Sequence, residues 1–366
     1  MGQHSYKYGF FWPAILAAFT GCGPAKTTGD TGAEQVNLPT LACTDTVTVP
    51  GHIDWRGNTP SPCDGDQAII VDGSIEVEPT ATDLNGLYCV CGITGAFTMR
   101  GAYQIENLRG LLNLEFVDQR FTIARDSEYL NWDAILDNES LTDISDLSRL
   151  RSIGGSLFIG GSSTYNKAFN TYGYTPEGNP ALTNLDGFSS LETIGGSLLY
   201  WGNVEVTQGP SFPALRSIGK SAQFRMARFE EGPHFASLET IGQELAIIDS
   251  QQHEIGHFPV LTEVGGLMIQ GTPEPFTTLG DLSALEQIKG DLIVSWNPSI
   301  EAGHEDKNRG LSDLGDLSGL ARIDGNVTIT KNESLCEDQA HSLVEAVGEA
   351  QIGGTITIED NRADCE

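Results

Sequence analysis

Apolar residues recur along this chain in one phrase: an apolar anchor, a Gly-rich pair, and two apolar residues that flank a variable position. The clearest copies are residues 150–159, 191–200 and 238–247. The ten anchors of the phrase are Ile93, Val117, Ile153, Ile194, Ile218, Ile241, Val264, Ile288, Ile323 and Ile352. Five of the nine intervals between these anchors are 23 or 24 residues long, and a fixed period of this length is typical of a solenoid.

Each half of the repeat predicts a different local structure. The Gly-x-Leu-x-Ile half alternates with a period of two residues, which is typical of a half-buried strand. A second apolar series lies three positions before each leading Leu, and this spacing favours a tight coil over an α-helix. The series comprises Leu111, Leu147, Phe188, Phe212, Phe235, Phe258, Leu282 and Leu317. Because one unit cannot bury its apolar face alone, the sequence predicts an all-β solenoid of about ten short stacked coils.

The motif Asn-x-small-apolar occurs four times. Its copies begin at Asn138, Asn179, Asn297 and Asn332. An Asn that recurs at one phase of a coil is expected to satisfy turn backbone groups from inside the stack, because its amide both donates and accepts hydrogen bonds. The alternative is glycosylation, since Asn138 and Asn332, together with Asn326, also fit the acceptor pattern Asn-x-Ser/Thr.

The N-terminal residues resemble a bacterial lipoprotein signal. One cation, Lys7, precedes an apolar run at residues 10–19 that is too short to span a bilayer, and Thr-Gly-Cys22 follows. We therefore expect cleavage before Cys22 and acylation of its thiol, although Phe19 stands where such signals usually carry Leu. The alternatives are a plain secretory signal and a buried Cys22. In lipoproteins of this kind, Gly23 after the lipidated Cys favours export to the outer membrane.

Three segments follow from this interpretation. Residues 1–21 are the signal peptide, residues 22–42 are a flexible tether rich in Gly, Thr, Ala and Pro, and residues 43–366 are the solenoid. The formal net charge of −30 repels nucleic acid and anionic headgroups, so we expect no nucleic-acid partner. An acidic surface of this kind keeps the chain soluble and attracts cations or basic partners.

The cysteines predict three disulfides. Of seven Cys residues, six remain once Cys22 is lipidated, and an even number in an exported protein indicates disulfide pairing. Cys336 and Cys365 flank the last unit and are expected to pair there. Near the other end, Cys63 is expected to pair with Cys89 or Cys91, and Cys43 with the remaining one. A metal or redox role for Cys89-Val-Cys91 is the alternative, but the spacing is one residue instead of two.

The segment His253-Glu254-Ile-Gly-His257 matches the zinc protease signature His-Glu-x-x-His. That chemistry needs an α-helix, which places both imidazoles on one face with the Glu as general base. The repeat register opposes a helix here, because His257 precedes Phe258 as His234 precedes Phe235. We therefore expect no catalytic residues, no bound metal and no cofactor, and keep a zinc hydrolase as the alternative function.

The repeats and both ends resemble the receptor L-domain family. The residues that carry the resemblance are Cys63–Gly65, Ala81–Leu87, Ile93–Phe97 and the Ile-Gly-Gly-x-Leu-x-Ile units. The resemblance implies a right-handed β-helix with leucine-rich-repeat character over about residues 63–365, capped by disulfides at both ends. The chain has about twice the coils of one L domain, so one continuous rod and two abutting halves both remain open. The receptors' cysteine-rich module, transmembrane helix and kinase are lacking, so hormone binding and signalling do not carry over.

Lipobox, repeats and closing Cys together look like those of bacterial surface lipoproteins. We expect a non-enzymatic protein at the bacterial envelope, held by the lipid on Cys22, that binds a protein or glycan or serves adhesion; a structural spacer is a further alternative. The two longest insertions carry the candidate partner-binding aromatics, because rings among small polar residues give contact area at low entropic cost. These are Tyr129, Trp132, Tyr165, Phe169, Tyr172 and Tyr174. The opposing interpretation is that these rings fold back and cover the stack.

The lipoprotein interpretation predicts a modified N-terminus. Mass spectrometry of the native protein should find Cys22 as the first residue, with the mass of attached acyl chains, because the short apolar run ends at this residue. A Cys22→Ser variant should lose membrane attachment. An unmodified Cys22 in native protein would contradict the interpretation.

Overall fold

The computed structural model describes residues 37–57, 59–124, 138–161, 163–166, 171–174, 178–203, 205–272, 276–295, 310–363 and 365, with the backbone alone for 163–166 and 171–174. Contacts divide the chain into two compact units, Met1–Asn37 and Leu38–Glu366. All helices and strands of the described residues lie in the second unit. Most of its strands belong to one parallel sheet, in which the strands of successive repeats pair with one another in two ladders.

The first ladder joins the strands that carry the predicted anchors. Its neighbours pair in parallel from β1 to β21, and a single bridge from Ile323 to Ile352 continues it. The strands are β1 (Val47–Pro50), β3 (Ile69–Asp72), β5 (Val90–Ile93), β7 (Phe116–Val117), β9 (Ser152–Ile153), β13 (Thr193–Ile194), β15 (Ser217–Ile218), β17 (Thr240–Ile248), β18 (Glu263–Gln270), β19 (Gln287–Ile288) and β21 (Arg322–Ile323).

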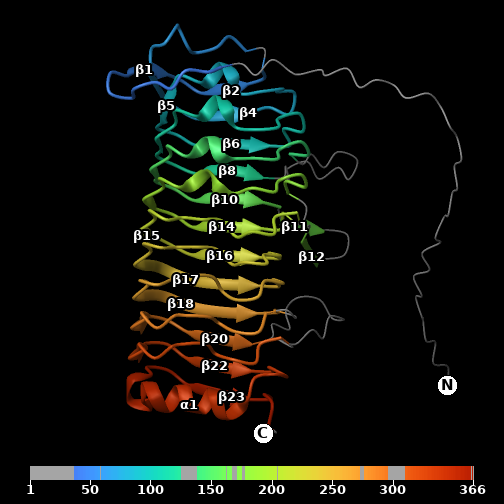
Figure 1. The fold of residues 1–366 in the computed structure, drawn as a ribbon, viewed down its shortest axis with the longest axis vertical. Helices are drawn as coiled ribbons and strands as arrows, with labels where there is room; N and C mark the ends of the chain where they lie inside the picture. The colour runs from blue at the N-terminus through green and yellow to red at the C-terminus, as the bar shows by residue number, and fades with distance from the viewer. Residues whose placement is uncertain are drawn as a thin grey trace, which may run out of the picture. The chain divides into compact units, whose positions relative to one another are not determined.

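The second ladder joins the Leu-x-Ile strands, and Figure 1 shows them one above another from β2 to β23. The strands β17 and β18 run through the corner and take part in both ladders. The other members are β2 (Ile53–Trp55), β4 (Ile75–Val77), β6 (Phe97–Arg100), β8 (Phe121–Ala124), β10 (Leu157–Gly160), β14 (Leu198–Trp201), β16 (Ala222–Arg225), β20 (Leu292–Ser295), β22 (Val327–Thr330) and β23 (Ile356–Glu359).

Helical turns and one hairpin complete the described structure. Five short 3-10 helices are η1 (Asn85–Leu87), η2 (Arg109–Leu111), η3 (Ser145–Leu147), η4 (Asp186–Phe188) and η5 (Glu349–Gln351). The helix α1 (Glu337–Val347) lies at the C-terminal end of the stack, beside β23 (Figure 1). The strands β11 (Ser163–Asn166) and β12 (Thr171–Tyr174) form an antiparallel hairpin outside the main sheet.

The core lies between the ladders and the apolar series that precedes them. Alternate residues of the second ladder point inward, as Leu157 and Ile159 do at 0% and 2% exposure. All eight members of the predicted apolar series are buried. Four of them are Phe residues whose rings stack on one another at centroid distances of 5.3, 5.1 and 4.9 Å from Phe188 to Phe258. Each repeat therefore buries its apolar face against the equivalent face of its neighbours.

The Gly-rich pair of the phrase marks the corner between the two ladders. A Cβ atom added at Gly195, Gly219 or Gly242 would lie less than 3.0 Å from the carbonyl oxygen of the glycine one repeat earlier. The same backbone is hydrogen bonded between repeats, since the Gly195 N–H donates to Ile153 O and the Gly219 N–H donates to Ile194 O, each at 2.8 Å. At these three corners a side chain would collide with the preceding repeat, whereas Asp118, Lys289 and Asp324 occupy the equivalent position elsewhere and make the same hydrogen bond.

The recurring asparagines bond backbone groups from inside the stack, as the sequence predicts: Asn138 Oδ1 accepts from the Ala102 N–H at 2.9 Å, and its Nδ2 donates to Ala124 O at 3.2 Å. Their amides also form a buried chain, which the sequence did not predict. Asn138 Nδ2 donates to Asn179 Oδ1 at 2.7 Å, and Asn179 Nδ2 donates to Asn203 Oδ1 at 2.8 Å. Asn138 and Asn332 are fully buried, so neither is accessible to glycosylation in the folded protein. Asn297 lies outside the described residues. Asn326 is exposed, and its side chain is hydrogen bonded to Asp291 and Thr355.

The three disulfides join Cys43 to Cys91, Cys63 to Cys89 and Cys336 to Cys365. The sequence left the partners of Cys43 and Cys63 open, and the structure gives them. Because Cys89 and Cys91 each form a disulfide with another Cys, neither has the free thiol that a metal or redox site in this segment would need.

The β-rich repeat architecture is confirmed, with two additions that the phrase did not predict. The strands β1 to β4 extend both ladders ahead of the first anchor, Ile93. The helix α1 occupies the segment between Cys336 and the last strand, where only strands and corners were expected. The short η helices fit the spacing of three, because a 3-10 helix has three residues per turn.

A substitution at the corner tests the close approach. Gly219→Ala should lower the free energy of unfolding by about 1–3 kcal/mol, because the added methyl group collides with the Gly195 carbonyl. Gly266→Ala is the matched control, since a Cβ there meets only ordinary contacts at 3.4 and 3.6 Å. Urea unfolding measures both variants through the shift in midpoint. Equal losses in the two variants would contradict the explanation.

Candidate functional site

The outer face of the second ladder carries apolar side chains where a water-facing strand usually carries polar ones. The middle positions of six neighbouring strands are direct register partners, and we call them the apolar strip: Phe158, Leu199, Gln223, Ala246, Met268 and Ile293. Ala246 is buried, whereas the other five side chains are partly exposed. The exposed apolar side chains form two neighbouring pairs, Phe158 with Leu199 and Met268 with Ile293, separated by Gln223 and Ala246. This face is a candidate for recognition, because isolated exposed apolar residues are ordinary and grouped ones are not.

Aromatic rings and a guanidinium border the N-terminal part of the strip. The rings of Phe158 and Trp201 meet edge to face, with centroids 5.2 Å apart and an angle of 72°. The guanidinium carbon of Arg225 lies 5.7 Å from the centroid of the Trp201 ring, within the range of a cation–π interaction. These contacts hold Trp201 at the end of β14, beside the position at which β10 ends.

Asp249 adds a titratable group to this border. It follows β17 in a left-handed conformation, with φ of 51°. Burial raises the pKa of Asp249 to about 6, while the positive charge of Arg225 opposes the rise. The charge on this part of the surface therefore changes near pH 6.

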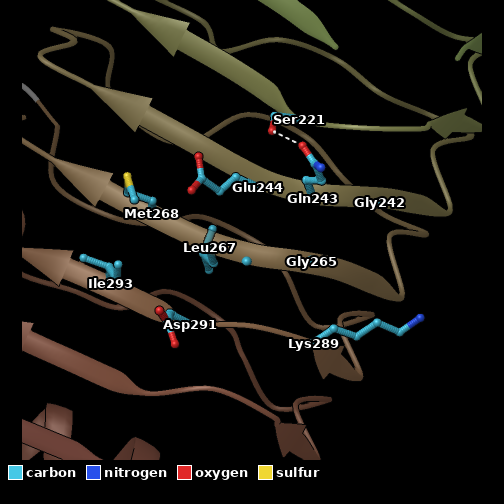
Figure 2. Close-up of a pocket in the computed structure, with 11 residues that line it drawn as sticks. Ser221, Gly242, Gln243, Glu244, Gly265, Leu267, Met268, Lys289, Asp291 and Ile293 are labelled. Atoms are coloured by element: carbon cyan, nitrogen blue, oxygen red, sulfur yellow. Dashed lines mark hydrogen bonds between the residues drawn. The ribbon is translucent and has the colours of Figure 1, made fainter. Parts of the chain in front are cut away.

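A pocket of about 470 Å³ opens on the C-terminal part of the strip (Figure 2). Gly266 has no side chain and lies between Glu244 and Asp291, so the gap is flanked by two carboxylates. Met268 and Ile293 line the pocket from the strip, and Figure 2 shows them on the same side of the sheet as Glu244.

The carboxylates and the lysine of the pocket have defined partners. Asp291 Oδ1 accepts hydrogen bonds from the backbone N–H of Asn326 at 2.6 Å and from its amide at 3.0 Å. Lys289, which also lines the pocket, forms an ion pair with Glu263 at 2.7 Å. Glu244 accepts a hydrogen bond from Gln223 at 3.4 Å. The pocket therefore combines apolar walls with acceptors, which is suited to holding a group that is both apolar and positively charged.

The residues that precede the two longest insertions lie at one edge of the stack. Ala124 and Gly160 end β8 and β10 and are register partners, and the insertions 125–137 and 162–177 begin beyond them. A third insertion begins after Ser295, at the same end of the second ladder.

The structure describes little of the predicted partner-binding aromatics. Tyr129, Trp132 and Phe169 lie outside the described residues. For Tyr165, Tyr172 and Tyr174 the backbone alone is described, in the hairpin of β11 and β12, where Tyr165 is the register partner of Tyr172. Cys22 also lies outside the described residues.

The zinc protease motif does not form a helix. His253 lies in a bend, and Glu254 and His257 take part in single bridges, with His257 aligned to His234 of the preceding repeat. The rings of His234 and His257 are 4.9 Å apart. Within the described residues, the motif provides no cluster of three ligand atoms close enough to hold a metal. The prediction that the repeat register prevents an α-helix at this motif is confirmed.

Comparison of the chain with protein-family models, with curated proteins and with solved structures found no match. Among the residues that the structure describes, no helix is both long enough and apolar enough to cross a bilayer.

Sequence reasoning placed the candidate site in the insertions and missed the apolar strip. The signal was present, because Phe158, Leu199 and Ile293 occupy the variable position of the phrase, which should face water. Trp201 lies two residues after Leu199, and Arg225 lies two residues after Gln223. The same alternation therefore predicts that both side chains face outward. Glu244 and Asp291 lie far apart in the sequence, and the strand register brings them to either side of Gly266.

The raised pKa of Asp249 predicts a pH-dependent stability. The folded-state pKa of about 6 exceeds the unfolded value of 3.8, so this group's stabilising contribution is complete below about pH 4 and is lost as pH rises through about 6. Asp249→Asn should therefore stabilise the protein at pH 7.5 relative to wild type, by at most about 3 kcal/mol, and have a smaller effect at pH 4.

Urea unfolding at both pH values measures this difference. The matched control is Asp281→Asn, because hydrogen bonds from Ser283 lower the pKa of Asp281 and give a dependence of opposite sign. An Asp249→Asn effect that is equal at pH 4 and pH 7.5 would contradict the assignment.

Proposed function

We propose that this protein is a non-enzymatic, envelope-anchored lipoprotein that binds a protein or glycan partner on the outer face of its second ladder. The observation that carries the proposal is the apolar strip. Phe158 is next to Leu199 and Met268 is next to Ile293, and these four side chains are partly exposed in a chain of net charge −30; Gln223 and the buried Ala246 lie between the two pairs. In a strongly acidic protein, apolar side chains grouped on one face are suited to recognition and are costly to leave in water.

Two further features support a binding role for the same face. The pocket at Gly266 adds carboxylates beside apolar walls, and Trp201 adds a ring that a partner can contact by stacking or by its edge. The insertions leave the stack at the edge of this face, after Ala124, Gly160 and Ser295. Loops at the edge of a rigid sheet are where binding residues concentrate, so the insertion aromatics and the strip belong to one proposed surface.

For the fold, we infer a right-handed solenoid of about ten or more coils that is similar to receptor L domains. Support comes from the in-register parallel ladders and from the general handedness of parallel connections, of which about 98% are right-handed. The placement of this solenoid at the envelope, held by a lipid on Cys22 and exported to the outer membrane, rests on the N-terminal signal alone.

Photo-crosslinking in cells of the native host tests the binding role. A benzoylphenylalanine residue at position 199, in the middle of the strip, should yield a discrete covalent adduct with one partner. The same residue at position 260 is the control, because Val260 is exposed at 41% in a turn away from the strip. We expect an adduct when the crosslinking residue stands at position 199 and none when it stands at position 260.

Serine variants separate binding from stability. Leu199→Ser with Met268→Ser should reduce partner capture at least ten-fold, while the thermal midpoint changes little because both side chains are only partly buried. Thr328→Ser, on the outer face of β22 beyond the strip, should leave capture unchanged. Failure to find any adduct at position 199 would favour a structural spacer over a binding protein.

A further inference from the structure

A second cluster of chemically active side chains lies at the N-terminal end of the stack, away from the apolar strip. His52 comes directly before β2, Asp54 is the second residue of that strand, and Glu76 is the second residue of β4. Asp54 and Glu76 are register partners in the parallel pair. Because residues two positions apart on a strand share a face, His52 and Asp54 point to the same side, and Glu76 lies opposite Asp54.

The three ligand atoms lie close together. His52 Nε2 is 2.8 Å from Asp54 Oδ1 and 3.8 Å from Glu76 Oε2. Within the described residues, this is the group of His, Cys, Asp and Glu side chains whose donor atoms all lie within 4.8 Å of one another. The donor atoms of a tetrahedral Zn²⁺ site with bonds of 2.0–2.1 Å are about 3.3 Å apart, so the two distances lie on either side of the required value.

The backbone holds this cluster in place. The N–H of Gly51 donates to Asp72 O at 3.0 Å, and the N–H of Ile53 donates to Ser74 O at 2.9 Å. These bonds fix the residues on both sides of His52 against the neighbouring repeat. An imidazole and two carboxylates are therefore brought together by the sheet register and not by a mobile loop, which favours binding because less entropy is lost.

The electrostatics of the cluster favour a cation. Like charges directly opposite each other on paired strands destabilise the pair, and Asp54 faces Glu76 in this way. In the described part of the chain, the ion pairs of these two carboxylates are those with His52, while the nearby Arg56 is paired with Glu78 at 3.9 Å. A divalent cation between the carboxylates would remove the repulsion.

The space beside the cluster is open. A hollow of about 600 Å³ is lined by His52, Asp54, Arg56 and Thr59, together with Val49 and two prolines. All three ligand side chains are exposed, at 47%, 52% and 58%. A metal here would keep one position for water or for a group supplied by a partner, as zinc sites with three protein ligands do.

We propose that His52, Asp54 and Glu76 bind a divalent transition-metal ion of the Zn²⁺ class. The imidazole nitrogen favours such an ion over Ca²⁺ or Mg²⁺, which prefer ligand sets made of oxygen atoms. The ion joins β2 to β4 and so stabilises the N-terminal end of the parallel sheet, where, among the described strands, β1 pairs with β3 and β2 with β4.

Calorimetric titration with ZnCl₂ alone tests the site, on the oxidised full chain after treatment with a chelator. One equivalent of Zn²⁺ should bind to the wild-type protein. His52→Ala and Glu76→Gln should each weaken binding at least ten-fold, and Ca²⁺ in excess should not displace Zn²⁺. The matched control is His257→Ala, which removes an exposed imidazole that also has a neighbouring ring, His234, and should leave Zn²⁺ binding unchanged.

Thermal unfolding distinguishes loss of the site from loss of the fold. Without metal, Glu76→Gln should be at least as stable as wild type, because it removes the repulsion with Asp54. Zn²⁺ should raise the thermal midpoint of the wild-type protein and not that of Glu76→Gln. Absence of Zn²⁺ binding to the wild type, unchanged binding in the His52→Ala and Glu76→Gln variants, or its loss in His257→Ala would each overturn the proposal.

Discussion

The close approach of the backbone at the corner between the two ladders determines the rest of the structure. At Gly195, Gly219 and Gly242 the chain passes so near to the preceding repeat that a single methyl group does not fit. This contact fixes the register of both flanking strands, because a slip of one residue would bring a side chain into the corner and turn the buried residues outward. The phrase is therefore constrained by its glycines at these corners and by its apolar anchors in every repeat.

A fixed register makes each residue type stack on itself. Phe188, Phe212 and Phe235 form one column of rings, and Asn138 and Asn179 belong to a chain of amides. Buried amides that bond one another strengthen each other in a medium of low dielectric, and an amide without its partner would be destabilising. Asn138 and Asn179 also stand where the chain returns from its two longest insertions. The amide chain thus anchors the repeats at the points where their sequences vary most in length.

Much of this fold can be predicted from the sequence, because the repeat carries the constraint in a readable form. The anchors, the apolar series and the buried Asn positions follow from spacing alone. The helix α1 does not, since its Ala340 and Val344 pack at the end of the stack, where no further repeat imposes the phrase. The strands ahead of Ile93 do carry a signal, because Val71-Asp-Gly73-Ser-Ile75-Glu-Val77 follows the phrase with a single Gly at the corner, as the copy at Ile323 does.

The candidate surfaces are less predictable than the fold. The alternation of the phrase places Phe158 and Leu199 on the outer face, but it does not show which outward residues of successive repeats become neighbours. Glu76 is separated from His52 and Asp54 by the strand β3, and only the pairing of β2 with β4 brings the three side chains together. Sequence periodicity reports which positions are equivalent, whereas a site depends on which unlike positions become neighbours.

The register of the apolar strip also sets a length scale for anything that binds along it. Neighbouring strands are about 4.8 Å apart, so the six positions from Phe158 to Ile293, of which all but the buried Ala246 are partly exposed, follow that spacing over about 24 Å. An elongated partner whose own subunits repeat at a similar distance can meet every position in phase. A partner with another spacing falls out of phase after two or three strands, so the proposed binding role would favour partners of matching periodicity as well as matching chemistry.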